Sequence, residues 1–247
     1  MKKIETEKQI KEYYQEGDVV DQYEQNRYGN IKRSLSHWIE CDAIEYLLKK
    51  HALFPNGQFL DLACGTGRLT RALVSQGFRI ISADFSREML EAAKAKSALE
   101  KKYFYPVHAD AFALPFEEEF DGIFTVRFIR HYKLEKRALI YKQIHRVLKP
   151  KGVLVFDVLN ARVDARAHER SIHDETYSAE SIRQELAEHG FDLVEMVAGN
   201  ILGIPVFTVA KKWSLLTVGR SLASHYRCQK DVVNRATHWM AAARKTA

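Results

Sequence analysis

Apolar residues recur along this chain with two different periods, and the order of the periods predicts the fold. Short apolar runs predict strands over residues 58–63, 79–83, 103–107, 122–126 and 153–159. Apolar positions at helical spacing predict helices between them, over residues 68–76, 86–99 and 134–148. Strands that alternate with helices are joined by right-handed crossovers, so the pattern predicts an α/β fold with a mainly parallel sheet.

The segments on either side of this alternation differ from it. Residues 1–53 predict helices, because apolar residues recur at helical spacing before the break Phe54-Pro55-Asn56-Gly57. Further along, Pro150 and Gly152 stand at the second and fourth positions of an expected type I turn. A helix is expected after the N-cap residue Ser178, with Ser181 in its first turn and Gly190 just past its end.

The last third of the chain predicts an antiparallel pair and a basic tail. Strands are expected over 191–197 and 205–209, and their link is too short for a helical crossover, so they should pair antiparallel. Two short helices are expected beyond Trp213, with apolar stripes at Leu215, Val218, Leu222 and at Val232, Val233, Ala236, Trp239, Met240, Ala243. We expect both to dock on the domain; a membrane-surface helix is the alternative.

Charge is unevenly distributed along the chain. The formal net charge is +6, yet the residues from Lys211 onward hold eight Lys or Arg and a single acid, Asp231. The body before them is therefore almost neutral. A basic tail can attract phosphate or an anionic membrane surface, or can simply be a solvated helical face.

A glycine turn carries the first chemical signal. In "LDLACGTGRLT", Gly65 and Gly67 follow a predicted strand and allow close approach of a ligand to the backbone. Asp61 ends that strand, and Asp84 ends the next one, where an acid can accept both hydroxyls of a ribose. Dinucleotide sites use an acid in the same way, but their third glycine is replaced here by Thr70.

The surrounding motifs decide between these cofactors. The stretches "SADFSREML", "ADAFALPF", "FDGIFT" and "IHRVLKPKGVLVFDV" follow the glycine turn in order. The chain resembles class I S-adenosylmethionine-dependent methyltransferases, in the type 11 group of small-molecule enzymes that includes quinone-ring methyltransferases, over about residues 20–210. The resemblance implies a Rossmann-like seven-stranded sheet that ends in an antiparallel hairpin. It divides the chain into an N-terminal helical lid (1–53), a cofactor-binding domain (54–213) and a basic helical extension (214–247).

By this resemblance, the cofactor is S-adenosylmethionine and its product S-adenosylhomocysteine. Asp61 is expected near the methionine amino group, Asp84 at the ribose, and Asp110 at the adenine amine. The other expected cofactor contacts are Ala63, Gly65, Gly67, Phe85, Met89, Ala111 and Thr125. At Lys151 the sequence departs from the family, which usually has glycine there.

The part of the site that binds the methyl acceptor is expected directly after the fourth predicted strand. His131 is the candidate base or substrate contact, with packing as the alternative role, and Arg127 and Arg130 are candidates to grip an anionic substrate. From the lid, Tyr14, Tyr23 and Arg27 are expected to face the site. His168 and His173 lie where relatives place substrate-contacting insertions, but no helical period orders them, and no metal is expected.

These features predict a methyltransferase acting on an O, N or C nucleophile of a small molecule. The alternatives are an RNA or protein methyltransferase that docks through the basic tail, and a partner subunit that binds the cofactor without turnover. Three scattered cysteines and no long apolar run predict a cytoplasmic protein, monomeric or homodimeric, with peripheral membrane contact through the tail left open. Nucleic acid is not expected as a partner.

Overall fold

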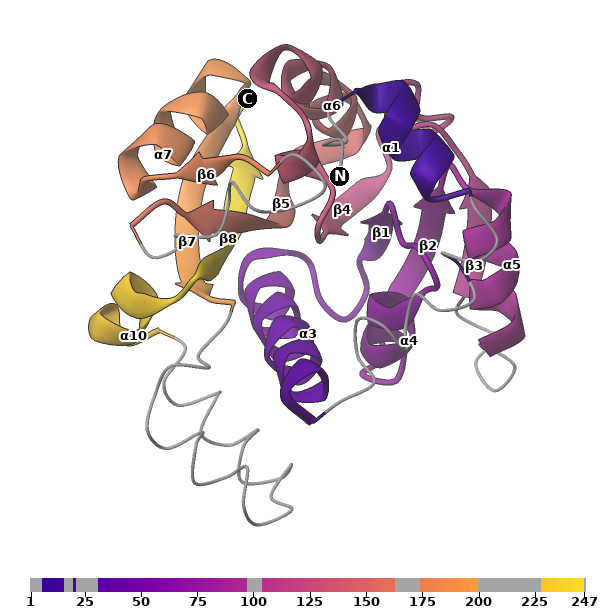
Figure 1. Cartoon of the computed structure of the whole chain (residues 1–247), viewed down its shortest axis with the longest axis horizontal. Coiled ribbons are helices and arrows are strands. Elements are labelled where there is room, and N and C mark those ends of the chain that lie inside the picture. The colour runs from indigo at the N-terminus through magenta and orange to yellow at the C-terminus, as the bar shows by residue number, and fades with distance from the viewer. Residues whose placement is uncertain are drawn as a thin grey trace.

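The computed structural model describes residues 6–15, 20, 31–96, 104–162, 174–199 and 228–246. Its elements alternate as the apolar periods predict (Figure 1). The helices are α1 (Glu7–Tyr13), α3 (Ile31–His51), α4 (Arg68–Val74), α5 (Arg87–Lys96), α6 (Leu134–Val147), α7 (Ala179–Glu188) and α10 (Lys230–Arg235), with the 3-10 turn η1 (Ile129–His131). The strands are β1 (Gln58–Leu62), β2 (Arg79–Asp84), β3 (Phe104–His108), β4 (Phe120–Thr125), β5 (Leu148–Asn160), β6 (Thr176–Tyr177), β7 (Phe191–Ala198) and β8 (His238–Lys245).

A single twisted sheet organises the described residues. Its order is β3-β2-β1-β4-β5-β8-β7, and the two-residue β6 pairs with β5 off this path. Strand β8 runs antiparallel to both of its neighbours, and every other pairing is parallel. The order reverses between β1 and β4, so the carboxyl ends of these strands face a crevice. The predicted α/β fold, with its mainly parallel sheet and antiparallel end, is confirmed.

Alternate residues of each central strand are buried on opposite faces of the sheet. Leu154 and Phe156 of β5 pack with the apolar side of α6 and α7, whereas Val153 and Val155 pack with that of α3 and α4. Strand side chains alternate between the two faces, so helices on both sides bury most positions of the central strands. Helix α3 therefore belongs to the core, since its Ile44, Leu47 and Leu48 are completely buried.

The start of α7 follows its sequence signals closely. Ser178 is the N-cap, and its side chain and that of Ser181 form a reciprocal capping box. Gly190 follows the helix with a φ of +81°, in the left-handed region that favours glycine. Both predictions for this helix are confirmed.

The prediction for the basic tail is wrong in its second half. Residues 238–245, expected to continue a helix with Trp239, Met240 and Ala243 on one stripe, form strand β8. This strand lies between β5 and β7 and is the antiparallel partner of β7 in the part of the chain that the structure describes. Residues 214–247 are thus not a purely helical extension, because β8 is part of the domain's sheet. The strand expected at 205–209 and the stripe Leu215, Val218, Leu222 lie outside the described residues.

Residues 149–152, expected to form a type I turn, lie at the start of β5, where its pairing with β4 is irregular. Lys151 has a φ of +65°, whereas both central residues of a type I turn have negative φ. When proline stands at the second position of a turn, a positive φ at the third position, here Lys151, is typical of a type II turn, where glycine is usual. The departure from the family at Lys151 therefore places a side chain in the left-handed region. None of the described helices has the length and apolar content needed to cross a membrane.

Candidate functional site

A pocket opens at the carboxyl ends of β1, β2 and β4, where the strand order reverses. Its empty space is about 770 Å³, counted out to its open mouth. It is lined by Ile10, Lys11, Tyr14, Leu62, Ala63, Gly65, Ala83, Asp84, Phe85, Ser86, Met89, Ala109, Asp110, Ala111, Phe112, Val126, Arg127, Phe128, His131 and Tyr132.

The floor of the pocket is the turn after β1, tied to the end of β2. Asp84 accepts hydrogen bonds from the backbone N–H of Gly65 (2.7 Å) and of Ser86 (2.9 Å), one at each carboxylate oxygen. Burial raises the pKa of Asp84, and these two N–H donors partly offset that effect. Gly65 has a φ of +54°, and a Cβ built on it would meet no atom within 4 Å. The glycine therefore faces open space, into which a ligand can approach the backbone.

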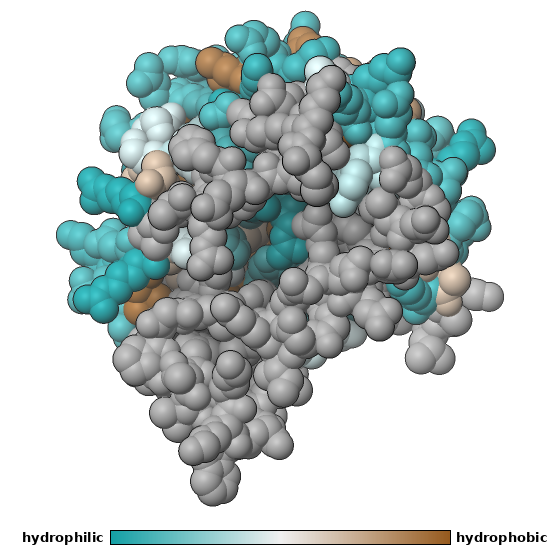
Figure 2. Space-filling view, in the orientation of Figure 1, coloured by the Kyte–Doolittle hydropathy of each residue, from teal (hydrophilic) through white to brown (hydrophobic). Residues whose placement is uncertain are grey.

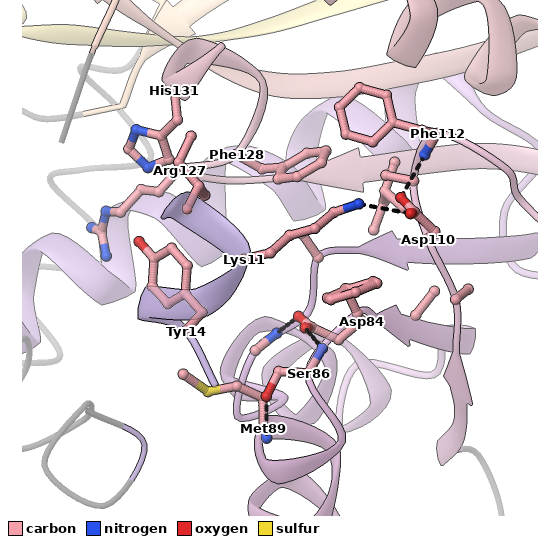
Figure 3. Close-up of a pocket in the computed structure, with 18 of the residues that line it drawn as sticks. Lys11, Tyr14, Asp84, Ser86, Met89, Asp110, Phe112, Arg127, Phe128 and His131 are labelled. Carbon is pink, nitrogen blue, oxygen red and sulfur yellow. Dashed lines mark hydrogen bonds and ion pairs between the residues drawn. The ribbon is translucent and has the colours of Figure 1, made fainter. Parts of the chain in front are cut away.

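One end of the pocket is built from two phenylalanines and a carboxylate (Figure 3). Asp110 accepts from the backbone N–H of Phe112 (3.0 Å) and pairs with the ammonium of Lys11 (2.7 Å). The same ammonium lies 4.4 Å from the centre of the Phe85 ring and 5.1 Å from that of Phe112. A lysine of α1 thus sits between two aromatic rings and a carboxylate, a setting that also suits a flat ring with an amino group.

The other end carries the residues expected for the acceptor. Figure 3 shows His131, Arg127 and Tyr14 together on the side of the pocket away from Asp110. The side chain of Arg127 forms an ion pair with Glu40, which is buried and also pairs with Arg68 at 3.0 Å. Burial opposes ionisation of Glu40, but the guanidinium groups of Arg127 and Arg68 outweigh it and lower the pKa of Glu40 to about 2. Arg127 is therefore held as a charged group at the pocket wall.

Behind His131 lies a second group of charges. Asp174 lies 2.8 Å from Nδ1 of His131 and 3.0 Å from Nε of Arg130, measured to its Oδ1. Arg130 also pairs with Asp157 at 2.5 Å. Arg130 does not line the pocket, so the structure does not bring it to the place expected for a substrate-gripping arginine.

Three of the expected cofactor residues lie beneath the pocket surface. Asp61 accepts a hydrogen bond from Thr70 (2.6 Å). Gly67 is the N-cap of α4, with a φ of +69°, and Thr125 is buried at the end of β4. None of the three is among the lining residues, whereas Ala63, Gly65, Asp84, Phe85, Met89, Asp110 and Ala111 all are. Tyr14 lines the pocket, and Tyr23, Arg27, His168 and His173 lie outside the described residues.

Sequence reasoning missed four residues of this region: Lys11, Glu40, Phe112 and Asp174. Phe112 directly follows the "ADA" motif and could have been found from it. Lys11 lines the pocket from α1, and Glu40 of α3 pairs with Arg127 at the pocket wall. Both residues come from helices far away in sequence, and no spacing rule links them to the site. Asp174 is brought to His131 by the pairing of β6 with β5, a two-residue strand in a segment that reads as a loop.

Comparison with known proteins shows what this chain is similar to. Residues 60–156 match the family model of a methyltransferase domain. The YqeM protein of Bacillus subtilis is 35% identical over 123 residues, which cover 49% of this chain and 46% of that protein. A demethylmenaquinone methyltransferase of Clavibacter sepedonicus is 39% identical over 99 residues, covering 40% of this chain and 39% of the enzyme. The chain thus spans about half the length, or less, of the curated relatives it matches.

The fold likeness extends much further than the sequence likeness. The structure of the magnesium protoporphyrin IX methyltransferase of Synechocystis, solved with bound S-adenosylhomocysteine, superposes with a TM-score of 0.69 at 14% identity. That alignment covers 98% of this chain and 100% of the other.

Proposed function

Because the chain carries a class I S-adenosylmethionine-dependent methyltransferase domain of the type 11 group, we propose that the protein methylates a small molecule whose nucleophile arrives protonated. The observation that carries this proposal is that the two ends of the pocket are lined by different kinds of side chain. Two carboxylates and two phenyl rings suit a nucleoside at one end, while His131 and Arg127 stand at the other. A relative that methylates demethylmenaquinone is consistent with a small acceptor.

The residues present fit S-adenosylmethionine. Both oxygens of Asp84 face the floor of the pocket, where they would accept from the ribose hydroxyls. Asp110 would accept from the adenine amine, with Phe85 and Phe112 on the two sides of the ring, and Gly65 leaves the space that the chain of the cofactor needs. Met89 and Ala111 complete the walls of this part. Such a cofactor supplies an electrophilic methyl group on a positively charged sulfur.

His131 is the proposed base. Nε2 of His131 would take the proton that the acceptor atom gives up when it is methylated. A neutral imidazole can take a proton from a hydroxyl or an acidic carbon. The buried position of His131 keeps bulk water from competing with the acceptor.

Arg127 is proposed to orient the acceptor rather than to react. Its guanidinium is anchored by Glu40, and it lines the pocket on the same side as His131. The ion pair with Glu40 neutralises part of its charge, so we expect it to favour an acceptor with a partial negative charge, such as a carbonyl or phenolate oxygen, over a dianion. Tyr14 of α1 closes the same side of the pocket.

Calorimetric titration tests the cofactor before any acceptor is known. S-Adenosylmethionine and S-adenosylhomocysteine should bind, and NAD should not. Binding of NAD alone, or of none of the three, contradicts the proposal. A screen of small phenols, quinols and heterocyclic amines with methyl-labelled S-adenosylmethionine then tests the acceptor, with His131→Gln as the matched variant that should bind cofactor normally and turn over slowly.

A further inference from the structure

We propose that Asp174 is a positioning residue that holds the proton of His131 on Nδ1 and so reserves Nε2 for the acceptor. The inference rests on the proposed function, in which His131 is the base, and it adds the group that orients that base. A neutral imidazole carries one proton, and the environment of its two nitrogens decides where that proton sits. A base with the proton on the wrong nitrogen cannot accept another one there.

The carboxylate beside Nδ1 favours one tautomer by its charge. Oδ1 of Asp174 lies 2.8 Å from Nδ1, and the two side chains are 3% and 5% exposed. A carboxylate at this distance in a buried setting attracts an N–H and repels a lone pair. The ring nitrogen next to Asp174 therefore holds the proton, and Nε2, on the opposite edge of the ring, keeps its lone pair.

The backbone that follows Asp174 fixes it in this place. The N–H of the next residue, Glu175, donates to the carbonyl of Arg130 at 2.9 Å, which ties the segment to η1. Strand β6 follows at once and pairs with β5, Thr176 opposite Leu159. Side chains anchored by regular pairing keep a base in register better than side chains on a free loop.

The charges around His131 also suit a base that becomes cationic. Arg130 stands between Asp174 and Asp157, so this group of three carries a net charge of −1. Among the residues that the structure describes, the other charged or titratable groups facing this region are Arg127 with its partner Glu40, His238, and Lys11, Tyr14 and Tyr132 at the pocket. Protonation of His131 brings the Asp157–Arg130–Asp174–His131 group to neutrality. The arrangement thus stabilises the imidazolium that forms during transfer.

The direct test is the tautomer of His131, read from the long-range ¹H–¹⁵N spectrum of the ¹⁵N-labelled protein above the pKa of the ring. The signal is assigned by its loss in His131→Gln. We expect protonated Nδ1 and unprotonated Nε2 in the wild-type protein. Protonation at Nε2 in the wild type overturns the proposal without any variant at Asp174.

Variants at Asp174 test its causal role. Asp174→Asn should move the proton to Nε2 in a substantial fraction of molecules, because the amide can donate to Nδ1. Asp174→Glu, which keeps the carboxylate, should retain the wild-type tautomer. The proposal is overturned if Asp174→Asn keeps the wild-type tautomer of His131. If Asp174→Asn does not fold, the proposal is overturned by a changed tautomer in Asp174→Glu.

Binding and turnover separate this inference from the proposed function. S-Adenosylhomocysteine should bind Asp174→Asn within about twofold of the wild type, since Asp174 does not line the pocket. With an acceptor, kcat should fall by about 10- to 100-fold at nearly constant KM, the range expected when general base catalysis is lost. If the wild-type protein does not bind the cofactor, the proposed function is contradicted. The tautomer of His131 is measured without cofactor and tests the role of Asp174 separately.

Discussion

The ammonium of Lys11 lies 2.7 Å from the carboxylate of Asp110, between the rings of Phe85 and Phe112. It therefore occupies the space that the adenine ring takes in the proposed complex. Helix α1 carries this lysine, and its Thr6 capping box fixes where the helix begins. Cofactor binding must then displace the lysine from Asp110 or share the carboxylate with it.

We expect Lys11→Met to bind S-adenosylhomocysteine about 2- to 5-fold more tightly, because the competing ion pair is lost while most of the side chain's volume remains. The ion pair is partly exposed, with side chains 19% and 33% accessible, so it contributes no more than about 1 kcal/mol. Calorimetry measures the change. Lys8→Met on the same helix is the control, since Lys8 points to solvent. Weaker binding by Lys11→Met would show that the lysine contacts the cofactor instead of competing with it.

Asp84 should be the strongest single determinant of cofactor affinity. Asp84→Asn replaces a charged acceptor of two ribose hydrogen bonds by a neutral amide, so affinity for S-adenosylhomocysteine should fall by about 10- to 100-fold. The amide keeps one oxygen for the N–H of Gly65 or of Ser86. Asp192→Asn, on the exposed surface of β7, is the matched control and should bind normally. Unchanged affinity in Asp84→Asn would remove Asp84 from the proposed site.

Stability should depend on pH through Asp61. Burial raises the pKa of its carboxyl to about 7, although Thr70 donates to it and the Arg68 guanidinium also favours the charged form. The native state then keeps a proton that the unfolded chain has already released, so this contribution is complete below about pH 4 and is lost as pH rises to about 7. Urea unfolding from pH 4 to pH 8 should show a loss on the order of 2–4 kcal/mol from this group.

Asp61→Asn isolates this effect. The amide has nearly the same shape and can still accept from Thr70, but it does not titrate. The decline between pH 4 and pH 7 should therefore flatten in Asp61→Asn and persist in Asp192→Asn. An equal decline in wild type and Asp61→Asn would assign the pH dependence to other groups.

The ion pair between Arg137 and Glu185 should be important for stability behind the pocket. It is bidentate, at 2.8 and 2.6 Å, and Arg137 also donates to the carbonyl of Tyr132. The pair joins α6 to α7, and its side chains are 5% and 9% exposed. Arg137→Met leaves a buried carboxylate without its partner, so we expect a loss of about 3–5 kcal/mol in urea unfolding.

The double variant Arg137→Met with Glu185→Met discriminates between charge and packing. Removing both charges should recover a large part of that loss, because no isolated charge remains in the core. A double variant as unstable as Arg137→Met would indicate that packing around Tyr141 and Tyr177, both near Glu185, dominates instead.

Local sequence signals were sufficient to predict features that depend on neighbouring residues of a single helix or strand. The strands before Gly65 and at Asp84, the capping of α7 by Ser178, and the glycine after that helix follow from residues that are close in sequence. Order and spacing of the motifs were also enough to place Asp84, Phe85 and Asp110 at one pocket, because the carboxyl ends of parallel strands meet at one edge of a sheet.

Tertiary structure decided the rest. Residues 238–245 contain three consecutive alanines, which favour helices, and their apolar positions fit a helical stripe. Packing overrides that preference, since the small side chains of Ala241, Ala242 and Ala243 fit between helices on both faces of the sheet while the backbone pairs with β5 and β7. The sequence also does not predict the contacts of Lys11 with Asp110 and of Asp174 with His131. Contacts between residues so far apart depend on how whole elements pack. By itself the sequence determined the alternation of strands and helices, the mainly parallel sheet and many of the pocket residues; the fold alone decided the order of the strands and which charges stand beside the pocket.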